Sequence, residues 1–247
     1  WLYKSVFVPG QTSSTYTIQS VQKSHDGEYM CIASNLYGSG TSKPLYLSVQ
    51  YGPNIAQLGM KDVEEGDNLI VTCNVSANPP AIVMWTRSGE QISQAAVLNL
   101  PSISRNQEGN YTCTANNVLY PTGLSPDFRQ ASETLGIQVL YGPGSSVSLS
   151  ANSSLYEVEE GQKAETMTCK AACKPGCSYI WLKGSTEMYN TSTLSLGTVH
   201  RNNTGNYTCK AYNTLLGQSR QSTVVIQVRI KFAPIVKIQA NAEGNNP

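Results

Sequence analysis

The sequence predicts an all-β protein built from repeated domains, and two observations support this. One pattern of cysteine, tyrosine and glycine occurs three times along the chain, which is typical of a repeat architecture. Apolar residues also alternate with polar ones, as they do on a strand that buries one face. The alternating segments are Leu69-x-Val71-x-Cys73-x-Val75, Leu98-x-Leu100 and Leu194-x-Leu196. With 247 residues, the chain has room for two or three domains.

The repeated pattern ends at three cysteines, Cys31, Cys113 and Cys209. A tyrosine lies two residues before each of them, and a glycine lies four residues before. Apolar residues occupy matching positions further upstream in all three copies. The matched tyrosines and glycines are Tyr29, Tyr111 and Tyr207, and Gly27, Gly109 and Gly205. Chance does not align this many positions three times, so the chain contains three copies of one unit.

A second cysteine and a tryptophan precede the pattern. Cys73 lies twelve residues before Trp85, and Cys169 lies twelve before Trp181. Trp1 occupies the equivalent position in the first copy, so we expect its cysteine to lie before residue 1.

Three joints of similar sequence divide the copies. They are Gln50-Tyr51-Gly52-Pro53, Leu140-Tyr141-Gly142-Pro143 and Lys231-Phe232-Ala233-Pro234. We therefore expect the C-terminal part of a truncated domain in residues 1–50 (the N-terminal segment) and complete domains in residues 53–141 (domain two) and 143–231 (domain three). The first strand of a further truncated domain is expected in residues 234–247.

The order Cys, Trp and Tyr-x-Cys in a unit of some 90 residues resembles the immunoglobulin superfamily. The resemblance implies tandem immunoglobulin-like β-sandwiches with Greek-key topology, in which a disulfide joins strands B and F. It implies the bridges Cys73–Cys113 and Cys169–Cys209, with Cys31 unpaired. The tryptophan of strand C is expected to pack on the bridge. The hydroxyl of the tyrosine before the second cysteine is expected to bond back across the turn into strand F.

The sequence departs from the family at one position. Members often have Asp six residues before the second cysteine, but His25, Gln107 and Asn203 stand there. This departure favours intermediate or constant-type domains. The Tyr-Gly-Pro joints are similar to those of carcinoembryonic-antigen-related and hemicentin-like adhesion proteins.

Cys173 and Cys177 are additional to this framework and lie in the loop between strands B and C. Their Cys-x-x-x-Cys spacing is similar to that of some invertebrate members of the superfamily. Pro175 and Gly176 suit the middle of a type II turn, which predicts a local Cys173–Cys177 disulfide. Two free thiols are the alternative. A metal site is disfavoured, because no histidine stands near and two cysteines cannot fill four positions.

Six sequons for N-linked glycosylation are present, and beside a cystine framework they favour the secretory route. They are Asn74, Asn110, Asn152, Asn190, Asn202 and Asn206. We expect about half of them to carry sugar. Asn110 and Asn206 face outward if the neighbouring Tyr111 and Tyr207 face inward.

Two features could form partner contacts. Domain two has an extended loop between strands F and G, and its Tyr120, Phe128 and Arg129 have the composition of a binding hot spot. The alternative is a long hairpin folded over its own sheet. Domain two also carries four basic and eight acidic residues, whereas domain three carries nine basic and five acidic. This asymmetry could steer copies of the chain together, or could be ordinary surface variation.

The remaining composition excludes several functions. A net charge of +1 does not indicate binding to nucleic acid or acidic membranes. The two histidines, His25 and His200, lie in equivalent loops of separate copies, so we expect no catalytic residues, no metal, no cofactor and no small-molecule substrate.

We expect an extracellular, cell-surface or secreted protein for adhesion or recognition, with homophilic or heterophilic protein partners and a membrane anchor outside residues 1–247. One alternative is the ectodomain of a receptor kinase or phosphatase, and another is a secreted matrix or defence protein. An intracellular muscle array is disfavoured by the paired cysteines.

Overall fold

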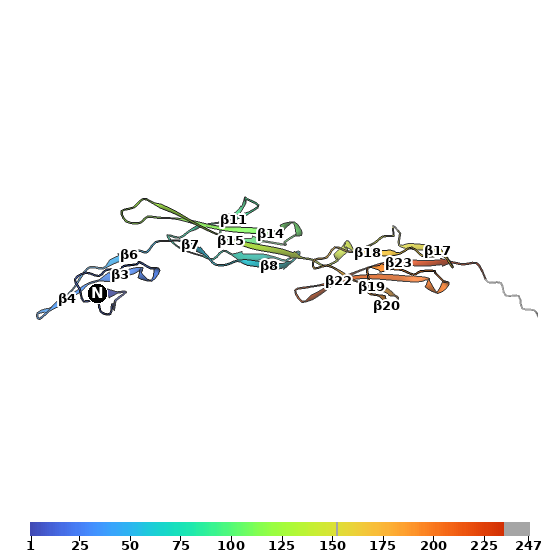
Figure 1. Cartoon of the computed structure of the whole chain (residues 1–247), viewed down its shortest axis with the longest axis horizontal. Coiled ribbons are helices and arrows are strands. Elements are labelled where there is room, and N and C mark those ends of the chain that lie inside the picture. The colour runs from blue at the N-terminus through green and yellow to red at the C-terminus, as the bar shows by residue number, and fades with distance from the viewer. Residues whose placement is uncertain (152, 235–247) are drawn as a thin grey trace, which may run out of the picture. The chain divides into compact units, whose positions relative to one another are not determined.

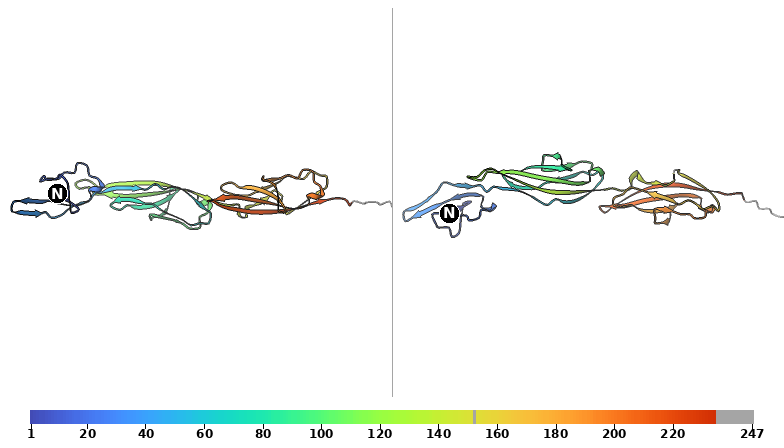
Figure 2. Two further views of the ribbon diagram at one scale, coloured as in Figure 1. Left: turned by 90° about the horizontal axis from the view of Figure 1, so that it is seen from below. Right: turned by 45° about the horizontal axis from the view of Figure 1, so that its top comes forward.

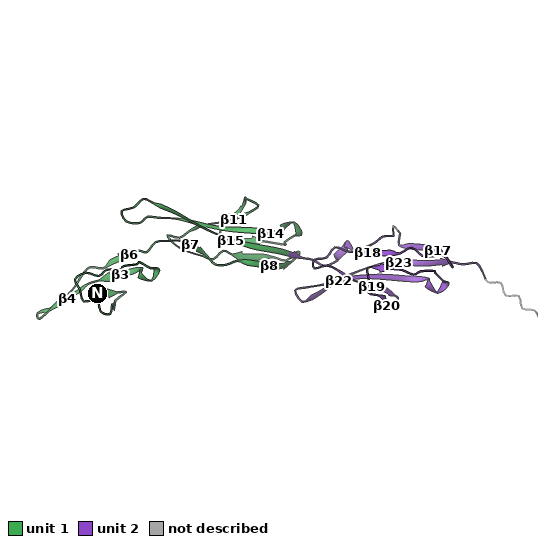
Figure 3. Ribbon diagram, in the orientation of Figure 1, with its two compact units in different colours: residues 1–138 green, residues 139–247 purple. Residues whose placement is uncertain are grey.

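The structure is a computed structural model that describes residues 1–151 and 153–234. The described chain is all-β, with only four short 3-10 helices. It forms two compact units, residues 1–138 and 139–247 (Figures 1 and 3). The expected strand in residues 234–247 falls almost wholly outside the described residues, as does Asn152.

The N-terminal segment contains a four-stranded sheet and a separate hairpin. The sheet has the order β2-β1-β3-β6, with β1 (Leu2–Tyr3), β2 (Val6–Phe7), β3 (Gly27–Met30) and β6 (Leu45–Leu47). The hairpin pairs β4 (Ile32–Asn35) with β5 (Gly38–Thr41). Tyr29 is buried, but Val21 of the expected core is 53% exposed. The apolar residues of this segment are therefore less covered than those of the other copies.

Domain two has two layers of mostly antiparallel strands. The larger layer has the order β12-β11-β14-β15-β8, and the smaller one consists of the pairs β13-β9 and β10-β7. The bounds are β7 (Tyr51–Ile55), β8 (Gly59–Glu64), β9 (Leu69–Thr72), β10 (Val75–Asn78), β11 (Ile82–Arg87), β12 (Glu90–Ser93), β13 (Val97–Leu100), β14 (Gly109–Leu119) and β15 (Asp127–Leu140). Burial alternates along β9 as predicted, with Val71 buried and Ile70 exposed.

Domain three repeats this arrangement, and its edge strand β17 runs parallel to β23. Its sheets have the orders β17-β23-β22-β19-β20 and β16-β18-β21. The bounds are β16 (Ser148–Leu149), β17 (Leu155–Glu159), β18 (Met167–Lys170), β19 (Ser178–Lys183), β20 (Thr186–Tyr189), β21 (Thr193–Leu194), β22 (Gly205–Leu215) and β23 (Gln218–Lys231). Figure 2 gives two further views of these strands. The core gathers Trp181, Leu194, Tyr207 and Ile226 around the cystine.

The disulfides of the structure are the pairs that the resemblance implies, together with the local one. They join Cys73 to Cys113, Cys169 to Cys209 and Cys173 to Cys177, and Cys31 is free. Trp85 and Trp181 are fully buried. A disulfide between two sheets with an indole packed nearby is what holds this kind of sandwich together.

The tyrosine that begins each strand F bonds back across the turn, as expected. Tyr29 Oη donates to the carbonyl oxygen of His25 at 2.9 Å. Tyr111 Oη donates to that of Gln107 at 2.8 Å, and Tyr207 Oη to that of Asn203 at 2.9 Å. The three positions that depart from the family pattern therefore accept the same hydrogen bond through their backbone.

The predicted type II turn at Pro175-Gly176 is wrong. Such a turn needs a positive φ at its third residue, and Gly176 has none. The Lys174–Pro175 peptide bond is cis, and Lys174 forms an antiparallel bridge with Tyr141 through two backbone hydrogen bonds of 2.9 Å. The bridge fixes the loop in another conformation, in which the Cα atoms of Cys173 and Cys177 still lie 5.3 Å apart.

Candidate protein-contact sites

The loop between strands F and G of domain two forms the tip of a long β-hairpin. β14 and β15 pair from Gly109 and Ile137 to Leu119 and Asp127, and they run side by side in Figure 1. Tyr120 is 61% exposed and Phe128 is 60% exposed. Leu124 in the same loop, which was not among the predicted contact residues, is exposed as well. The hairpin thus presents three large apolar side chains to solvent.

Arg129 is held by its own hairpin. Its Nε lies 2.8 Å from Asp127 Oδ2, and its Nη2 lies 2.5 Å from the same oxygen. The Cβ of Arg129 packs closely against Gly52. If residue 52 had a side chain, its Cβ would lie only 2.9 Å from the Cβ of Arg129. The stem of Arg129 therefore packs on the Tyr-Gly-Pro joint, and its guanidinium offers a partner less than the sequence suggested.

The base of this hairpin is fixed to the residues that precede domain two. The backbone N–H of Tyr120 donates to Gln50 Oε1 at 2.5 Å. Asn117 Nδ2 donates to the carbonyl oxygens of Tyr51, at 3.1 Å, and Pro79, at 2.8 Å. A loop whose ends are held in this way loses less conformational entropy when it binds a partner.

Asn117 has an equivalent in domain three, and neither asparagine was among the predicted contact residues. Asn213 Nδ2 donates to the carbonyl oxygens of Tyr141, at 3.1 Å, and Pro175, at 2.8 Å. Both side chains are buried. The signal was present, since an asparagine lies four residues after the last cysteine of each copy, Asn35 included. In both domains it ties strand F to the tyrosine of the preceding joint and to the B–C loop.

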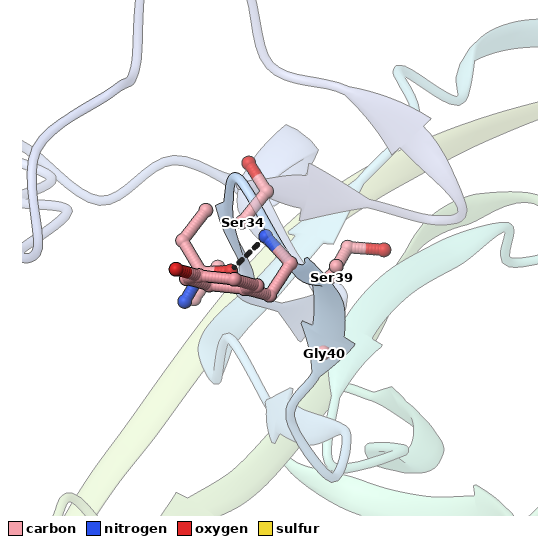
Figure 4. A pocket seen from close by; sticks show the side chains of 7 residues that line it. Ser34, Ser39 and Gly40 are labelled. Atoms are coloured by element: carbon pink, nitrogen blue, oxygen red, sulfur yellow. Dashed lines mark hydrogen bonds between the residues drawn. The ribbon is translucent and has the colours of Figure 1, made fainter.

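The N-terminal segment presents a second exposed hairpin. Leu36 is 100% exposed and Tyr37 is 97% exposed at the turn between β4 and β5. The backbone N–H of Tyr37 donates to Asn35 Oδ1 at 2.9 Å, which stabilises the turn. Figure 4 shows the side chains beside it, where Ser34, Ser39 and Gly40 leave an open hollow. The apolar pair Leu36-Tyr37 between Asn35 and Gly38 indicates this exposed tip in the sequence, although neither residue was among the predicted contacts.

The sequon asparagines that the structure describes are all exposed. They are Asn74, Asn110, Asn190, Asn202 and Asn206. Asn110 and Asn206 face outward, because Tyr111 and Tyr207 beside them are buried. Nothing in the fold hinders attachment of sugar at these five positions.

The opposite net charges of domains two and three are partly neutralised by ion pairs within each domain. Arg201 forms a bidentate pair with Glu160, with Nη2 2.7 Å from Oε2 and Nε 3.1 Å from Oε1. Hydrogen bonds from the Arg201 side chain and backbone lower the pKa of Glu160 to about 2. Arg105 forms the equivalent pair with Glu65 in domain two, at 2.9 Å. These are intradomain pairs of partly exposed groups, which contribute little by themselves to partner binding.

Two kinds of site are absent from the described residues. No group of three or more His, Cys, Asp or Glu side chains there could hold a metal ion. Within residues 1–151 and 153–234, no helix is long and apolar enough to cross a membrane.

Domains two and three are β-sandwiches, and each has a core cystine, a buried tryptophan and a tyrosine whose hydroxyl donates to the backbone four residues earlier. These features together define a protein of tandem immunoglobulin-like domains. The family model described as "Immunoglobulin domain" matches residues 53–117 and 146–213. The chain belongs to this family.

Curated relatives include neural cell adhesion molecule 1 from human and from cattle. Each is 37% identical over 117 residues, covering 42% of this chain and 14% of the relative. The chain therefore spans a small part of these relatives' length.

Solved structures agree on the fold. A three-domain fragment of titin matches with a TM-score of 0.53 and 18% identity, covering 95% of this chain and 87% of that one. The first two immunoglobulin domains of DIP-gamma match with a TM-score of 0.52 and 19% identity, covering 76% of this chain and all of that one.

Proposed function

We propose that this chain is the extracellular part of a cell adhesion or recognition protein, which acts through protein–protein contacts and not by catalysis. The observation that carries the proposal is the F–G hairpin of domain two. Its Tyr120, Leu124 and Phe128 are exposed on a loop whose base is fixed by Gln50 and Asn117. Rigid aromatic side chains on an anchored loop give large contact area at low entropic cost. The similarity to neural cell adhesion molecule 1 supports the same function.

Residues 53–141 and 143–231 act as two complete domains in this proposal. The matches to the immunoglobulin family, at residues 53–117 and 146–213, support these bounds. Each range also contains its own cystine and its own buried tryptophan.

The extracellular location rests on the disulfides and the exposed sequons. Disulfides persist in oxidising compartments, and five accessible sequons provide attachment sites for sugar. Secretion from a eukaryotic host should yield a glycoprotein heavier than the 26.7 kDa chain. A secreted product whose mass matched the bare chain would contradict this location.

Bead aggregation tests the contact. Beads coated with the chain should aggregate, and Tyr120→Ala and Phe128→Ala should each reduce aggregation several-fold without changing its salt dependence. The control is Ile70→Ala, which removes an exposed apolar side chain from the opposite sheet of domain two.

Salt separates the hairpin from the alternative based on charge. If the opposite charges of domains two and three held the copies together, aggregation would fall as salt is raised, because screening shortens their reach to about 8 Å at physiological ionic strength. The two substitutions would then have no effect. Aggregation that responds to neither treatment would remove this segment from the contact.

A further inference from the structure

Domain two has an open groove at the edge where its two layers part. It measures about 280 Å³. Ile92 and Val97 form its exposed rim, and the buried Leu98 and Tyr111 form its floor. The groove is separate from the F–G hairpin, so its occupation by a ligand does not depend on the function proposed for that hairpin.

The groove is open because no strand among the described residues covers the edge between β12 and β13. β12 ends at Ser93 and β13 begins at Val97, so the connection is short and no further strand lies between them. Ser93 is the β12 residue in register with the buried Trp85. Its side chain is too small to reach across to β13.

Domain three closes the same place with a tyrosine. Tyr189 of β20 is in register with Trp181, as Ser93 is with Trp85. Tyr189 Oη donates to the carbonyl oxygen of Ser195 at 3.4 Å, so the side chain reaches from one layer to the other. Tyr189 also contributes to the raised pKa of Tyr207, for which burial is the main cause. It therefore lies near the residue that corresponds to Tyr111 on the groove floor.

Since the two domains are copies of one unit, domain three shows what fits the groove of domain two. We propose that this groove binds a tyrosine side chain of a second copy of the chain, and that the side chain is Tyr37. The carbonyl oxygen of Asn99, which corresponds to Ser195, accepts the hydrogen bond from the phenol. A cavity of about 150 Å³ suffices for benzene, so the groove has room for this ring.

Tyr37 is suited to the role by its position and surroundings. It is 97% exposed at the tip of the β4–β5 hairpin. The residues beside it, such as Ser34, Gly38 and Ser39, are small, so the tip is narrow and uncharged. The one charged side chain that lines the groove, Arg87, already donates to the carbonyl oxygens of Asn106 and Glu108. An uncharged aromatic side chain enters without displacing these bonds.

The contact joins different surfaces of the two copies, so each copy offers both a tyrosine and a groove. A single side chain gives weak affinity, and it becomes effective when many copies face each other on a surface. The groove of domain two is thus a receptor for the N-terminal hairpin of a neighbouring chain.

Titration with p-cresol, the side chain of tyrosine, tests the groove by NMR. Amide signals of β12 and β13 should shift, with a dissociation constant on the order of 1 mM. Ser93→Tyr should fill the groove from within, as in domain three, and abolish these shifts. Tyr189→Ser should open a second groove and double the number of sites. Shifts that survive Ser93→Tyr, or that never appear at β12 and β13, would overturn the proposal.

Sedimentation velocity of the whole chain tests the occupant. Self-association should weaken at least tenfold in Tyr37→Ala, whose exposed position leaves folding unaffected, and equally in Ser93→Tyr. The control Val225→Ala, which removes an exposed apolar side chain from β23 of domain three, should leave it unchanged. The second copy is the wrong occupant if p-cresol binds but the chain does not self-associate, or self-associates equally well in Tyr37→Ala. The groove then binds a tyrosine of another protein.

Discussion

Replacing Asn117 by Ala should destabilise domain two more than any other single polar change on β14. The side chain is buried, and its amide group donates to the carbonyl oxygens of Tyr51 and Pro79 at 3.1 and 2.8 Å. Alanine removes both donors and leaves two carbonyl groups that must find other partners. Asn213→Ala should do the same in domain three, where the two distances are identical.

The expected loss follows from three contributions. Each hydrogen bond contributes about 1 kcal/mol net, and a buried carbonyl left without a donor costs a further 1–3 kcal/mol, roughly. Asn117 Oδ1 is buried without a hydrogen-bond partner, so the wild-type fold already carries the cost of desolvating it. Alanine removes that atom, which offsets part of the lost stability. The free energy of unfolding should therefore fall by about 2–4 kcal/mol, enough to lower the melting temperature of a domain of this size by about 10 °C or more.

Native-state hydrogen exchange of the whole chain measures this loss for each domain. Protection of the β14 amides should fall in Asn117→Ala, while the β22 amides of the same sample serve as the internal reference. Asn116→Ala is the matched control, because its side chain lies on the other face of β14 and should change stability by less than about 0.5 kcal/mol. If Asn117→Ala costs no more than this control, the account of how strand F holds the joint is refuted.

Two further predictions concern domain three. The Glu160 pKa of about 2 lies below the ordinary value of 4.5, so the pair with Arg201 stabilises the fold above pH 4.5 and this contribution is lost as the pH falls towards 2. In Arg201→Ala the pKa of Glu160 should return towards 4.5 in an NMR titration, and an unchanged value would exclude Arg201 as the cause. Replacing Cys173 and Cys177 together by Ser should cost much less than the roughly 2–5 kcal/mol expected for Cys169–Cys209, because the loop that the bridge closes is very short. Equal losses in denaturant titrations would contradict this reasoning.

The repeat predicted most of the framework. Cysteine, tryptophan and tyrosine at fixed spacings predict a cystine, a buried indole and a tyrosine hydroxyl that donates to the backbone four residues earlier. All three features occur in domains two and three. These features could be predicted because each depends on residue types that few other structures need at that spacing.

Features that depend on backbone geometry could not be predicted in this way. The conformation at Pro175 depends on Lys174 pairing with Tyr141, a residue more than thirty positions away. The groove of domain two depends on the contrast between Ser93 and Tyr189, which is meaningful only once β12 and β20 are known to be equivalent. The exposure of Leu36 and Tyr37 follows from the β4–β5 turn, which the flanking Asn35 and Gly38 already indicated in the sequence.

The position of Asn110 on β14 has a consequence for how a partner approaches. A glycan there would project from the same face of the strand as Val118, which is eight residues further along. At about 3.3 Å per residue, the two lie roughly 26 Å apart. The sugar would cover the end of this face at Asn110 and leave the end beside Phe128 exposed. A partner would therefore bind at the hairpin end of the face.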